Sequence, residues 1–380
     1  MVLVAIVDGG ARGHAGALAY LRSNQLNEVV LIPGTGGARK NLINRLELPI
    51  FTDPLASLKK KESIVAFVFN SLRKWNPDFV HVDQDDAIAA GTVDALEEVG
   101  IPVFGPSRKA ARIESSKIWA REFMVRHDIP SPEFRAFTIG QLQEAFDYAT
   151  KLVERTGLVA FKADGLYGGK GVVMATRDTI GNATKRIKAM GEASERFLIE
   201  EGMRGREFSY YAVSDGTNLV FFKSAEDNKP AFNRNRGDNT GGMGCNSPTL
   251  TTRGLEGKIR EEIMLRAVRG LMEEGHPYKG ILYAGGIVDE RDEKPKVIEY
   301  NSRWGDPECH VILPGIQSDY FELITKAATG KLAGFEVEQD SFYRTCVIGA
   351  SEGYPGDHSA VKGKRIWINH DLIPEGVHFL

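Results

Sequence analysis

The sequence predicts a multidomain protein of the α/β and α+β classes that begins with a parallel sheet. In the first hundred residues, short apolar runs alternate with stretches of helical periodicity, a pattern typical of strands joined by right-handed helical crossovers. Farther along, longer strands alternate with glycine-rich loops. The 380 residues suffice for roughly two to four domains, each with a core of its own.

The elements of the first region are apolar runs and helical stripes that end at Pro, Gly or Asp. We expect strands at 2–7, 28–32, 79–82 and 102–104, and helices at 15–23, 63–74 and 87–99. The loops at 8–14, 33–37 and 83–86 follow three of these strands. They would meet at the carboxyl edge of the sheet, where parallel sheets bind ligands.

The second region mixes strands, helices and polar loops. We expect helices at 109–127, 141–155 and 255–274, and strands at 159–162, 172–175, 196–201, 207–214, 280–289 and 296–300. Residues 227–247 are polar and rich in Gly and Asn, which favours a functional loop. A loop at 301–308 and a helix after residue 319 follow, and short strands and turns are expected from about residue 334 onward.

Composition excludes several classes of protein. Lys and Arg number 48 against 51 Asp and Glu, a net charge of −3 that argues against a broad nucleic-acid-binding face. No apolar run approaches the roughly 18–20 residues of a membrane span. The apolar start lacks the basic flank and cleavage site of a signal peptide. Cys245, Cys309 and Cys346 are few and scattered, so we interpret them as isolated free thiols in a reducing cytoplasm.

A glycine-rich loop between two predicted strands, Lys162–Gly171, suits a nucleotide phosphate. Its glycines let backbone N–H groups approach an anion, and its two lysines add positive charge. It is not a Walker A loop, because no Ser or Thr follows Lys170 and no helix follows the loop. The alternative is a hairpin with solvated lysines.

Glu299 and Asn301 alternate along a predicted strand and therefore share one face of it. Their oxygens suit Mg²⁺, which prefers one or two carboxylates together with phosphates and water. The next loop, Ser302–Glu308, adds one arginine and two acids, although two polar residues at a strand end can also simply be solvated.

Three further segments allow two interpretations each. Gly237–Gly244 either wraps a substrate or only turns the chain. Asp8–His14 resembles a dinucleotide loop, but its spacing is not G-x-G-x-x-G, so a dehydrogenase is a weak runner-up, and His14 can be a structural helix-start residue. Glu200 and Glu201 suit a hinge between lobes or an exposed strand end. The sequence shows no pattern typical of a Ser/His/Asp or Cys/His catalytic arrangement.

Taken together, these segments resemble the ATP-grasp enzymes and, more narrowly, the phosphoribosylamine–glycine ligase (glycinamide ribonucleotide synthetase) family. Several matching runs occur in the same order, which is more specific than any one alone. The runs are 105–106, 110–111, 113–114, 116–117, 162–165, 169–171, 239–244, 247–248, 282–285, 296–308 and 353–356.

The resemblance implies an ATP-grasp fold and a domain division. A parallel α/β domain (pre-ATP-grasp) would span 1–104, and the ATP-grasp core 105–333, with an inserted lid at about 122–195. A partial β-rich carboxyl-terminal domain would span 334–380. Chains of the family continue through further strands and a helix, so we expect either a sequence cut short or a reduced last domain.

The activity implied by the resemblance is the ATP-dependent ligation of glycine to 5-phosphoribosylamine in purine synthesis. The glycine carboxylate would attack the γ-phosphate, and the amine would displace phosphate from the acyl phosphate. The implied cofactors are ATP and Mg²⁺ or Mn²⁺, and positioning with electrostatics replaces a protein nucleophile. The implied partners are small-molecule substrates only, without nucleic acid or membrane, for a cytoplasmic monomer or homodimer.

The resemblance also implies roles for individual residues. Those implied to be catalytic are Arg303, Lys162 and Asp306. Those implied to bind ATP are Lys117, Lys162, Gly165, Gly168, Gly169, Lys170, Gly171, Glu200, Glu201 and Glu207, with the glycine loop as a lid, the Glu200-Glu201 backbone at adenine and Glu207 at the ribose. Those implied to hold the metal are Glu299 and Asn301. Those implied to contact the other substrates are Gly10, Arg12, His14, Gly34, Asp85, Asp227, Lys229, Asn239, Thr240, Gly241, Gly242, Met243, Asp306 and Glu308.

Departures from the family pattern fall in the acceptor loops. Gly13 stands where the family has Glu, Thr35 where it has Asn, and Pro230 where it has Arg, while 83–88 is rewritten with extra acids. A proline cannot replace an arginine that binds phosphate. Extra acids would repel a phosphate. The alternatives are therefore a ligase of the same family with another amino acid or amine, and a nucleotide-binding protein without catalysis.

Overall fold

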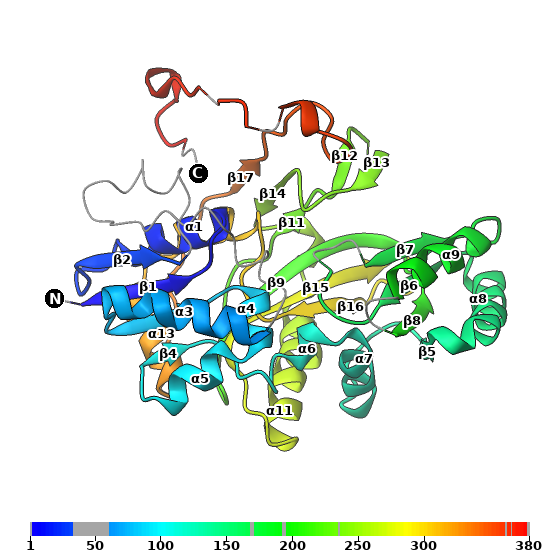
Figure 1. Cartoon of the computed structure of the whole chain (residues 1–380), viewed down its shortest axis with the longest axis horizontal. Coiled ribbons are helices and arrows are strands. Elements are labelled where there is room, and N and C mark those ends of the chain that lie inside the picture. Colours follow the sequence, from blue (N-terminus) through cyan, green and yellow to red (C-terminus); the bar gives the residue numbers. More distant parts are fainter. Residues whose placement is uncertain are drawn as a thin grey trace.

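The computed structural model describes residues 2–32, 61–167, 171–191, 195–234, 236–361, 363–365 and 367–377. Figure 1 shows three parts in a row: an amino-terminal α/β layer, a long central sheet, and a small sheet with two helices at the far end. In the described ranges, no helix is long and apolar enough to cross a membrane.

The amino-terminal sheet is parallel, as the alternation of strand and helix predicts. Its strands, in spatial order, are β2 (Glu28–Leu31), β1 (Leu3–Val7), β3 (Phe79–Val82) and β4 (Val103–Phe104). Helices lie on both of its faces, so successive residues of β1 enter different cores. Val4 and Ile6 pack with α1 (Ala11–Tyr20) and α13 (Tyr320–Ala328), whereas Ala5 and Val7 pack with α3 (Lys61–Trp75).

Two helices of this layer differ from their predicted bounds. The first, α1, begins at Ala11 rather than at 15, inside the glycine loop. A Cβ at Gly13 would lie 2.5 Å from the carbonyl oxygen of Asp8, so glycine is what lets the helix start this close to β1. The helix predicted at 87–99 is two helices, α4 (Asp85–Ala90) and α5 (Thr92–Glu98). Gly91 separates them at a φ of +89°, in the left-handed region that favours glycine.

The small sheet at the far end of the molecule is antiparallel. Its strands, in spatial order, are β5 (Phe134–Thr138), β8 (Arg196–Glu201), β6 (Val159–Ala163) and β7 (Val172–Ala175). The helices α8 (Leu142–Thr156) and α9 (Ile180–Gly191) cover one face of it (Figure 1). Three of the strands and α8 were predicted. β5, in which only Phe137 is buried, and α9 were not.

The central sheet lies between the amino-terminal sheet and the small sheet (Figure 1). Its antiparallel strands, in spatial order, are β10 (Leu219–Phe221), β9 (Gly205–Asp215), β15 (Lys279–Asp289) and β16 (Pro295–Asn301). The register of β16 shifts between Gly285 and Gly286, so that Ile298 has no residue opposite it. A bulge of this kind bends a strand and redirects its groups, and it occurs often beside active sites.

The helices around the central sheet are more broken than predicted. The helix expected at 109–127 is α6 (Arg112–Ser115) and α7 (Lys117–Arg126). Ser116 interrupts it because its hydroxyl accepts the N–H of Trp119 at 3.2 Å and caps α7. The helix expected at 255–274 consists of α10 (Glu256–Lys258), a π-helical segment (Ile259–Leu265) and α11 (Arg266–Glu273).

The polar segment 227–247, predicted to be a functional loop, contains several short strands. They are β11 (Glu226–Asp227), β12 (Pro230–Phe232), β13 (Arg236–Asn239) and β14 (Gly244–Ser247). β12 pairs with β13, while β11 and the distant β17 (Arg344–Val347) flank β14. These strands were not predicted, because short polar strands carry no apolar periodicity and their pairing is non-local.

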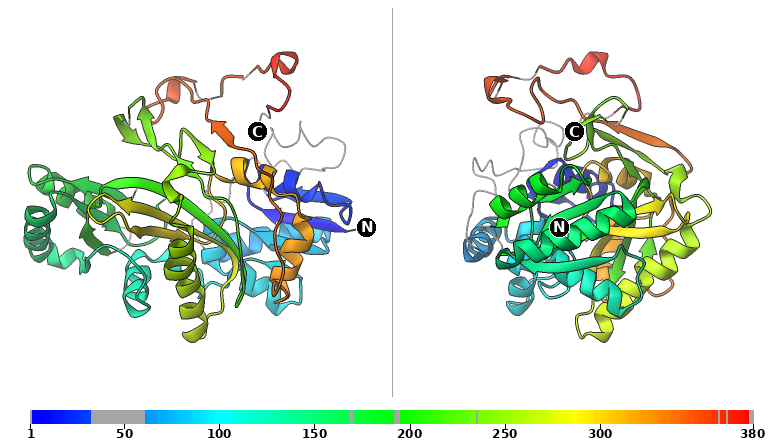
Figure 2. Two further views of the ribbon diagram at one scale, coloured as in Figure 1. Left: turned by 180° about the vertical axis from the view of Figure 1, so that it is seen from behind. Right: turned by 90° about the vertical axis from the view of Figure 1, so that its right-hand side faces the viewer.

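Cys245 and Cys346 lie directly opposite each other on β14 and β17. All three cysteines are free thiols, as expected, but two of them are cross-strand neighbours rather than isolated. Figure 2 shows the chain after β17 running along the outside of the molecule, away from the central sheet.

Trp304 joins the amino-terminal layer to the central sheet. Its ring is 1% exposed and lies in one continuous core with Val4 and Ile6 of β1 and with Tyr211 of β9. The loop that precedes α12 (Cys309–Ile312) is thus anchored between both layers. This position brings the carboxyl edge of the parallel sheet against the end of β16, where the sequence predicts the site.

Candidate active site

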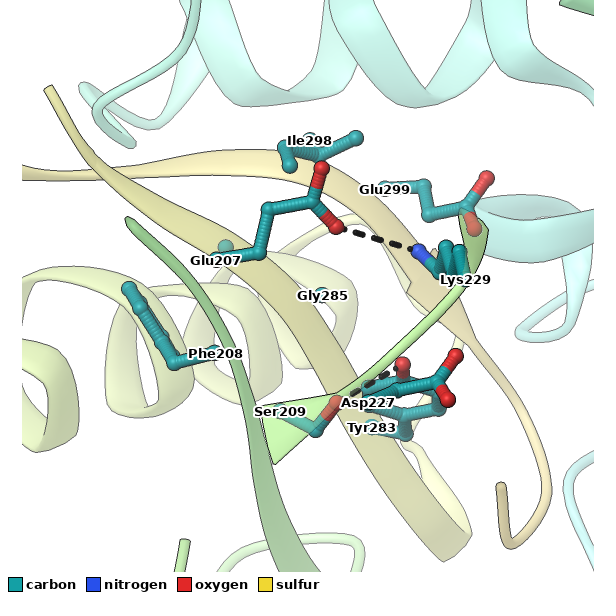
Figure 3. A pocket seen from close by; sticks show the side chains of 10 residues that line it. Glu207, Phe208, Ser209, Asp227, Lys229, Tyr283, Gly285, Ile298 and Glu299 are labelled. Atoms are coloured by element: carbon teal, nitrogen blue, oxygen red, sulfur yellow. Dashed lines mark hydrogen bonds and ion pairs between the residues drawn. The ribbon is translucent and has the colours of Figure 1, made fainter. Parts of the chain in front are cut away.

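A pocket opens on the face of the central sheet and is lined mainly by residues of β9, β15 and β16, together with Asp227 and Lys229. Figure 3 shows it from close by. Its lining residues are Glu207, Phe208, Ser209, Asp227, Lys229, Tyr283, Gly285, Gly286, Ile298 and Glu299. Four of these, namely Glu207, Asp227, Lys229 and Glu299, belong to the set predicted from the sequence.

Glu299 is the acid at the centre of a group of cations. Burial by itself would raise the pKa of Glu299, but the ammonium groups of Lys229, Lys162 and Lys117 outweigh burial and hold this pKa below its usual value. Lys229 also forms an ion pair of 3.3 Å with Glu207, the residue predicted to receive the ribose (Figure 3). The predicted lysines therefore converge on one ionised carboxylate.

The predicted metal ligands fit a hard cation. Glu299 and Asn301 share a face at the end of β16, and the Asn301 amide oxygen accepts from Arg303 Nη2 at 3.1 Å. The Asn301 Nδ2 atom is buried without a partner among the described residues, so this amide is oriented by its oxygen. No group of three or more His, Cys, Asp or Glu side chains that could hold a metal occurs in the described part of the chain. Two oxygen ligands, completed by phosphates and water, are what Mg²⁺ accepts.

Lys162 belongs to a buried network that the sequence analysis did not foresee. Glu200 of β8 pairs with Lys162 of β6 and, at 2.8 Å, with Nε of Arg121 of α7. Arg121 donates to the carbonyl oxygens of Val297 at 3.1 Å and Ile298 at 2.6 Å, and Lys162 donates to the latter at 3.3 Å. The bulge in β16 thus turns the Ile298 carbonyl toward both cations.

This network holds the Lys162 side chain in a fixed position on β6 of the small sheet. Burial would raise the pKa of Glu200, but Arg121 and Lys162 hold it below its usual value. The neighbouring Glu201 uses its side chain for Arg291 and its N–H for the carbonyl oxygen of Glu133, at 2.9 Å. Arg121 carries no local sequence signal, because a single arginine in a helix is ordinarily solvent-exposed.

We expect Glu200→Ala to lower the free energy of unfolding by about 3–5 kcal/mol, because it leaves two buried cations without their acid. Urea denaturation measures this change. The matched control is Glu201→Ala, where Arg291 is 45% exposed and the expected loss is about 0–1 kcal/mol. Equal losses in the two variants would contradict the assignment of Glu200 as the structural counter-ion.

The glycine-rich loop is docked on the amino end of α7. Ser116 Oγ donates to Asp164 Oδ1 at 3.0 Å, and Lys117 Nζ donates to the carbonyl oxygen of Gly165 at 2.6 Å. Gly171 packs on Tyr167, where a Cβ would lie 2.8 Å from the Tyr167 Cβ. The other predicted ATP-binding residues of this loop, Gly168, Gly169 and Lys170, lie outside the described residues, as does Gly34 of the predicted substrate set.

Arg303 is held by one acid, one side-chain amide and one backbone carbonyl. Besides Asn301, it contacts Glu114 at 3.4 Å and donates to the carbonyl oxygen of Trp304 at 3.0 Å. Glu114 also accepts the N–H of Ser302 at 2.8 Å, so it fixes the start of the loop. The sequence analysis matched Glu114 to the family pattern without assigning it a role.

At the amino-terminal edge of the site, Arg12 is bound by acids. Its Nε lies 2.6 Å from Asp8 and 3.8 Å from Asp83, and Gly10 N–H donates to Asp8 at 2.7 Å. Asp83 accepts the N–H of Trp304 at 2.9 Å. Burial raises the pKa of Asp83 to about 7, although Arg12 opposes the shift. This extra acid is therefore buried and bonded instead of facing a ligand as a bare charge.

Other predicted substrate residues do not line the pocket. Burial lowers the pKa of His14 to about 4, so this buried ring is neutral. Asp85 begins α4, and its carboxylate accepts the N–H of Asp86 at 3.0 Å. The Asp306 side chain is 44% exposed and lies 3.7 Å from His310.

The predicted substrate loop 239–243 does not line the pocket but is bonded to the chain at residues 228 and 229 beside it. Asn239 ends β13, and Thr240 donates through N–H and hydroxyl to the carbonyl oxygen of Lys229, both at 2.8 Å. Gly242 N–H donates to Thr240 Oγ1 at 3.0 Å, and Met243 N–H donates to the Asn228 carbonyl oxygen at 2.8 Å. The N–H of Gly241 points to the Tyr354 hydroxyl at 3.5 Å.

These features together define an ATP-grasp enzyme. They are a parallel amino-terminal sheet, a central antiparallel sheet, a small facing sheet, and lysines directed at an acidic strand end. The chain belongs to the phosphoribosylglycinamide synthetase family. The N domain of that family matches residues 2–114, and its ATP-grasp (A) domain matches residues 115–309.

Relatives of known name agree with this assignment. The chain is 37% identical to the phosphoribosylamine–glycine ligase of Ralstonia nicotianae, over 93% of this chain and 80% of that protein. It is 38% identical to the trifunctional purine biosynthetic protein adenosine-3 of Bos taurus, over 94% of this chain and 34% of that protein.

Solved structures show the same fold. The phosphoribosylamine–glycine ligase of Thermotoga maritima superposes with a TM-score of 0.72 at 28% identity, over 93% of this chain and 82% of that one. The biotin carboxylase domain of a Hydrogenobacter thermophilus 2-oxoglutarate carboxylase, in complex with MgADP, ADP and bicarbonate, superposes with a TM-score of 0.64 at 16% identity, over 90% and 73% of the two chains. The second likeness concerns the fold alone.

Proposed function

We propose that the chain is a phosphoribosylamine–glycine ligase, an ATP-dependent C–N ligase of de novo purine synthesis. It would join glycine to 5-phosphoribosylamine through an acyl phosphate and yield glycinamide ribonucleotide, ADP and phosphate. The observation that supports this most is the identity of 37% with a ligase of that name over 93% of this chain. The convergence of three lysines on Glu299 in the pocket is consistent with phosphoryl transfer.

ATP and Mg²⁺ (or Mn²⁺) are the proposed cofactors. Lys117 and Lys162 would bind the phosphates, and Glu299 with Asn301 would hold the metal, which supplies charge neutralisation of the phosphates. Lys162 is suited to this because Glu200 and the Ile298 carbonyl fix its ammonium before ATP binds. Catalysis then rests on positioning and electrostatic stabilisation.

Arg303 would stabilise the charge on the transferring phosphoryl group. Its guanidinium is held by Glu114, Asn301 and the Trp304 carbonyl, so little reorganisation is needed when charge develops. Arg12 would face the sugar phosphate at the edge of the parallel sheet. Because the acceptor loops are altered, the alternative proposal is a ligase of the same family that uses another amino acid or amine. That the protein is a cytoplasmic monomer or homodimer stays a prediction.

One assay tests the proposed reaction. ADP release is measured with ATP, Mg²⁺, glycine and phosphoribosylamine, and then with a panel of other amino acids and amines. We expect turnover that requires both glycine and phosphoribosylamine. Turnover with another pair and none with glycine would support a ligase of different specificity, and ATP binding without any turnover would support a non-catalytic protein.

A further inference from the structure

Asp227 is an acid of the pocket to which the proposed reaction gives no chemical role. It ends β11 and lines the pocket on the same side as Ser209 and Tyr283 (Figure 3). Its Oδ1 atom is buried and has no hydrogen-bond partner among the described residues. Buried carboxylate oxygens are ordinarily satisfied, so this one is available to a donor on a ligand.

The other carboxylates of this region are already engaged. Glu207 pairs with Lys229, and Glu299 is the proposed metal ligand. Glu308 accepts hydrogen bonds of 2.8 Å from both Ser209 and Tyr283. Asp227 is therefore the pocket carboxylate with one oxygen, Oδ1, that has no hydrogen-bond partner among the described residues.

The loop 239–243 packs against the Asp227 carboxylate through a glycine. Gly242 lies against it at a φ of +129°, and a Cβ at that position would lie 2.7 Å from Asp227 Oδ1 and 2.6 Å from Pro307 Cδ. A side chain at this position would press on the carboxylate, so the glycine lets the loop pack against Asp227 without displacing it.

Charged and titratable groups surround Asp227 on every side. They are Lys229 beyond β11, Glu207 of β9, Tyr283 of β15, Glu299 of β16, Cys245 of β14, Cys346 of β17, and Asp306 and Glu308 of the loop before α12. Burial and the charge of Glu308 raise the pKa of Asp227 to about 7, against the opposing influence of Lys229. A carboxylate of this kind is poised to exchange protons near neutral pH.

We propose that Asp227 is the proton acceptor for the attacking amine in the ligation step. This inference rests on the proposed function. The amine nitrogen forms the new C–N bond with its lone pair at the acyl carbon, and the C–O bond to phosphate breaks, with the electron pair leaving on phosphate. One N–H proton passes from nitrogen to Asp227 Oδ1 and from there to solvent. Glu308 is a positioning residue that acts on Asp227 through its charge.

The test separates acyl phosphate formation from amine transfer. Hydroxylamine traps the acyl phosphate as glycine hydroxamate. It is a small, strong nucleophile that in large excess reacts with acyl phosphates in water, and its proton passes to solvent without a protein base. In Asp227→Asn, we expect the rate of amide formation to fall about 10²- to 10⁴-fold relative to the rate of hydroxamate formation, the usual contribution of a general base. An equal fall in both rates would overturn the proposal.

The pH dependence supplies a second readout. Because the base acts when deprotonated, kcat/KM for phosphoribosylamine should rise with pH through about 7, where Asp227 titrates. Asp227→Asn should lack this rise. Glu308→Gln keeps an acceptor for Ser209 and Tyr283 but removes a negative charge, so the rise should move to lower pH. An unmoved rise in Glu308→Gln would overturn the proposal even if Asp227→Asn does not fold.

Failure of the proposed function would look different. Wild-type protein that forms no hydroxamate with glycine, ATP and Mg²⁺ would overturn the ligase assignment, and this proton acceptor with it. Wild-type protein that forms hydroxamate and amide, beside an Asp227→Asn variant with the same amide rate and pH profile, would overturn the proton acceptor alone.

Discussion

Glu299→Ala is expected to abolish Mg²⁺-dependent turnover while the protein remains folded. The variant removes the one carboxylate that the lysines of the pocket keep ionised at the proposed metal site. We expect kcat/KM to fall by about 10²- to 10³-fold or more, because a catalytic metal is worth several kcal/mol in the transition state. The measurement is ADP release as a function of Mg²⁺ concentration, with circular dichroism to verify the fold.

The matched control for this variant is Glu290→Ala. Glu290 is an exposed acid just beyond β15, in the same hairpin as Glu299 but outside the pocket. The control should keep wild-type turnover and the wild-type requirement for Mg²⁺. If Glu299→Ala also kept both, Glu299 would have no place in the metal site.

Trp304→Ala is expected to lower the free energy of unfolding by about 3–5 kcal/mol, the usual cost of truncating a large buried aromatic residue. The Trp304 ring stacks on Tyr211 at a centroid distance of 5.2 Å, and its Nε1–H donates to the Tyr320 hydroxyl at 3.0 Å. The backbone N–H of Trp304 also donates to Asp83, across the boundary between the two layers. Urea denaturation measures the loss.

Trp367→Ala is the control for this second variant. Trp367 is 85% exposed, so its truncation should change the free energy of unfolding by no more than about 0.5 kcal/mol. The loss of unfolding free energy in Trp304→Phe should lie between the losses in Trp304→Ala and Trp367→Ala, since Phe keeps an aromatic ring but lacks the indole N–H donor. Similar losses for Trp304→Ala and Trp367→Ala would contradict the view that Trp304 holds the layers together.

Much of the fold was predictable where a short segment carries its own signal. The strands β3 (Phe79–Val82) and β7 (Val172–Ala175) begin and end at the predicted residues, because each is a short apolar run between turn residues. Helix breaks were mispredicted although local signals existed, such as Gly91 in the left-handed region and the cap at Ser116. The strands of 227–247 had no such signal, since their partners lie elsewhere in the chain.

The candidate site divides in the same way. Lys162, Glu299 and Asn301 were selected from glycine spacing and strand alternation, both of which act over a few residues. Arg121 and Glu114 were not assigned a role, because each acts only through partners that lie far along the chain. Their importance appears only when α6 and α7 are packed against β16.

Local patterns in the sequence were enough to predict the parallel amino-terminal sheet and the candidate phosphate and metal residues, because these patterns depend on residues close together along the chain. Which charges are paired depends on contacts between segments that are distant in the sequence. The pKa of Asp227 reaches about 7 because folding buries its carboxylate near Glu308. Desolvation and charge proximity arise when segments distant in sequence meet, so no local pattern encodes them.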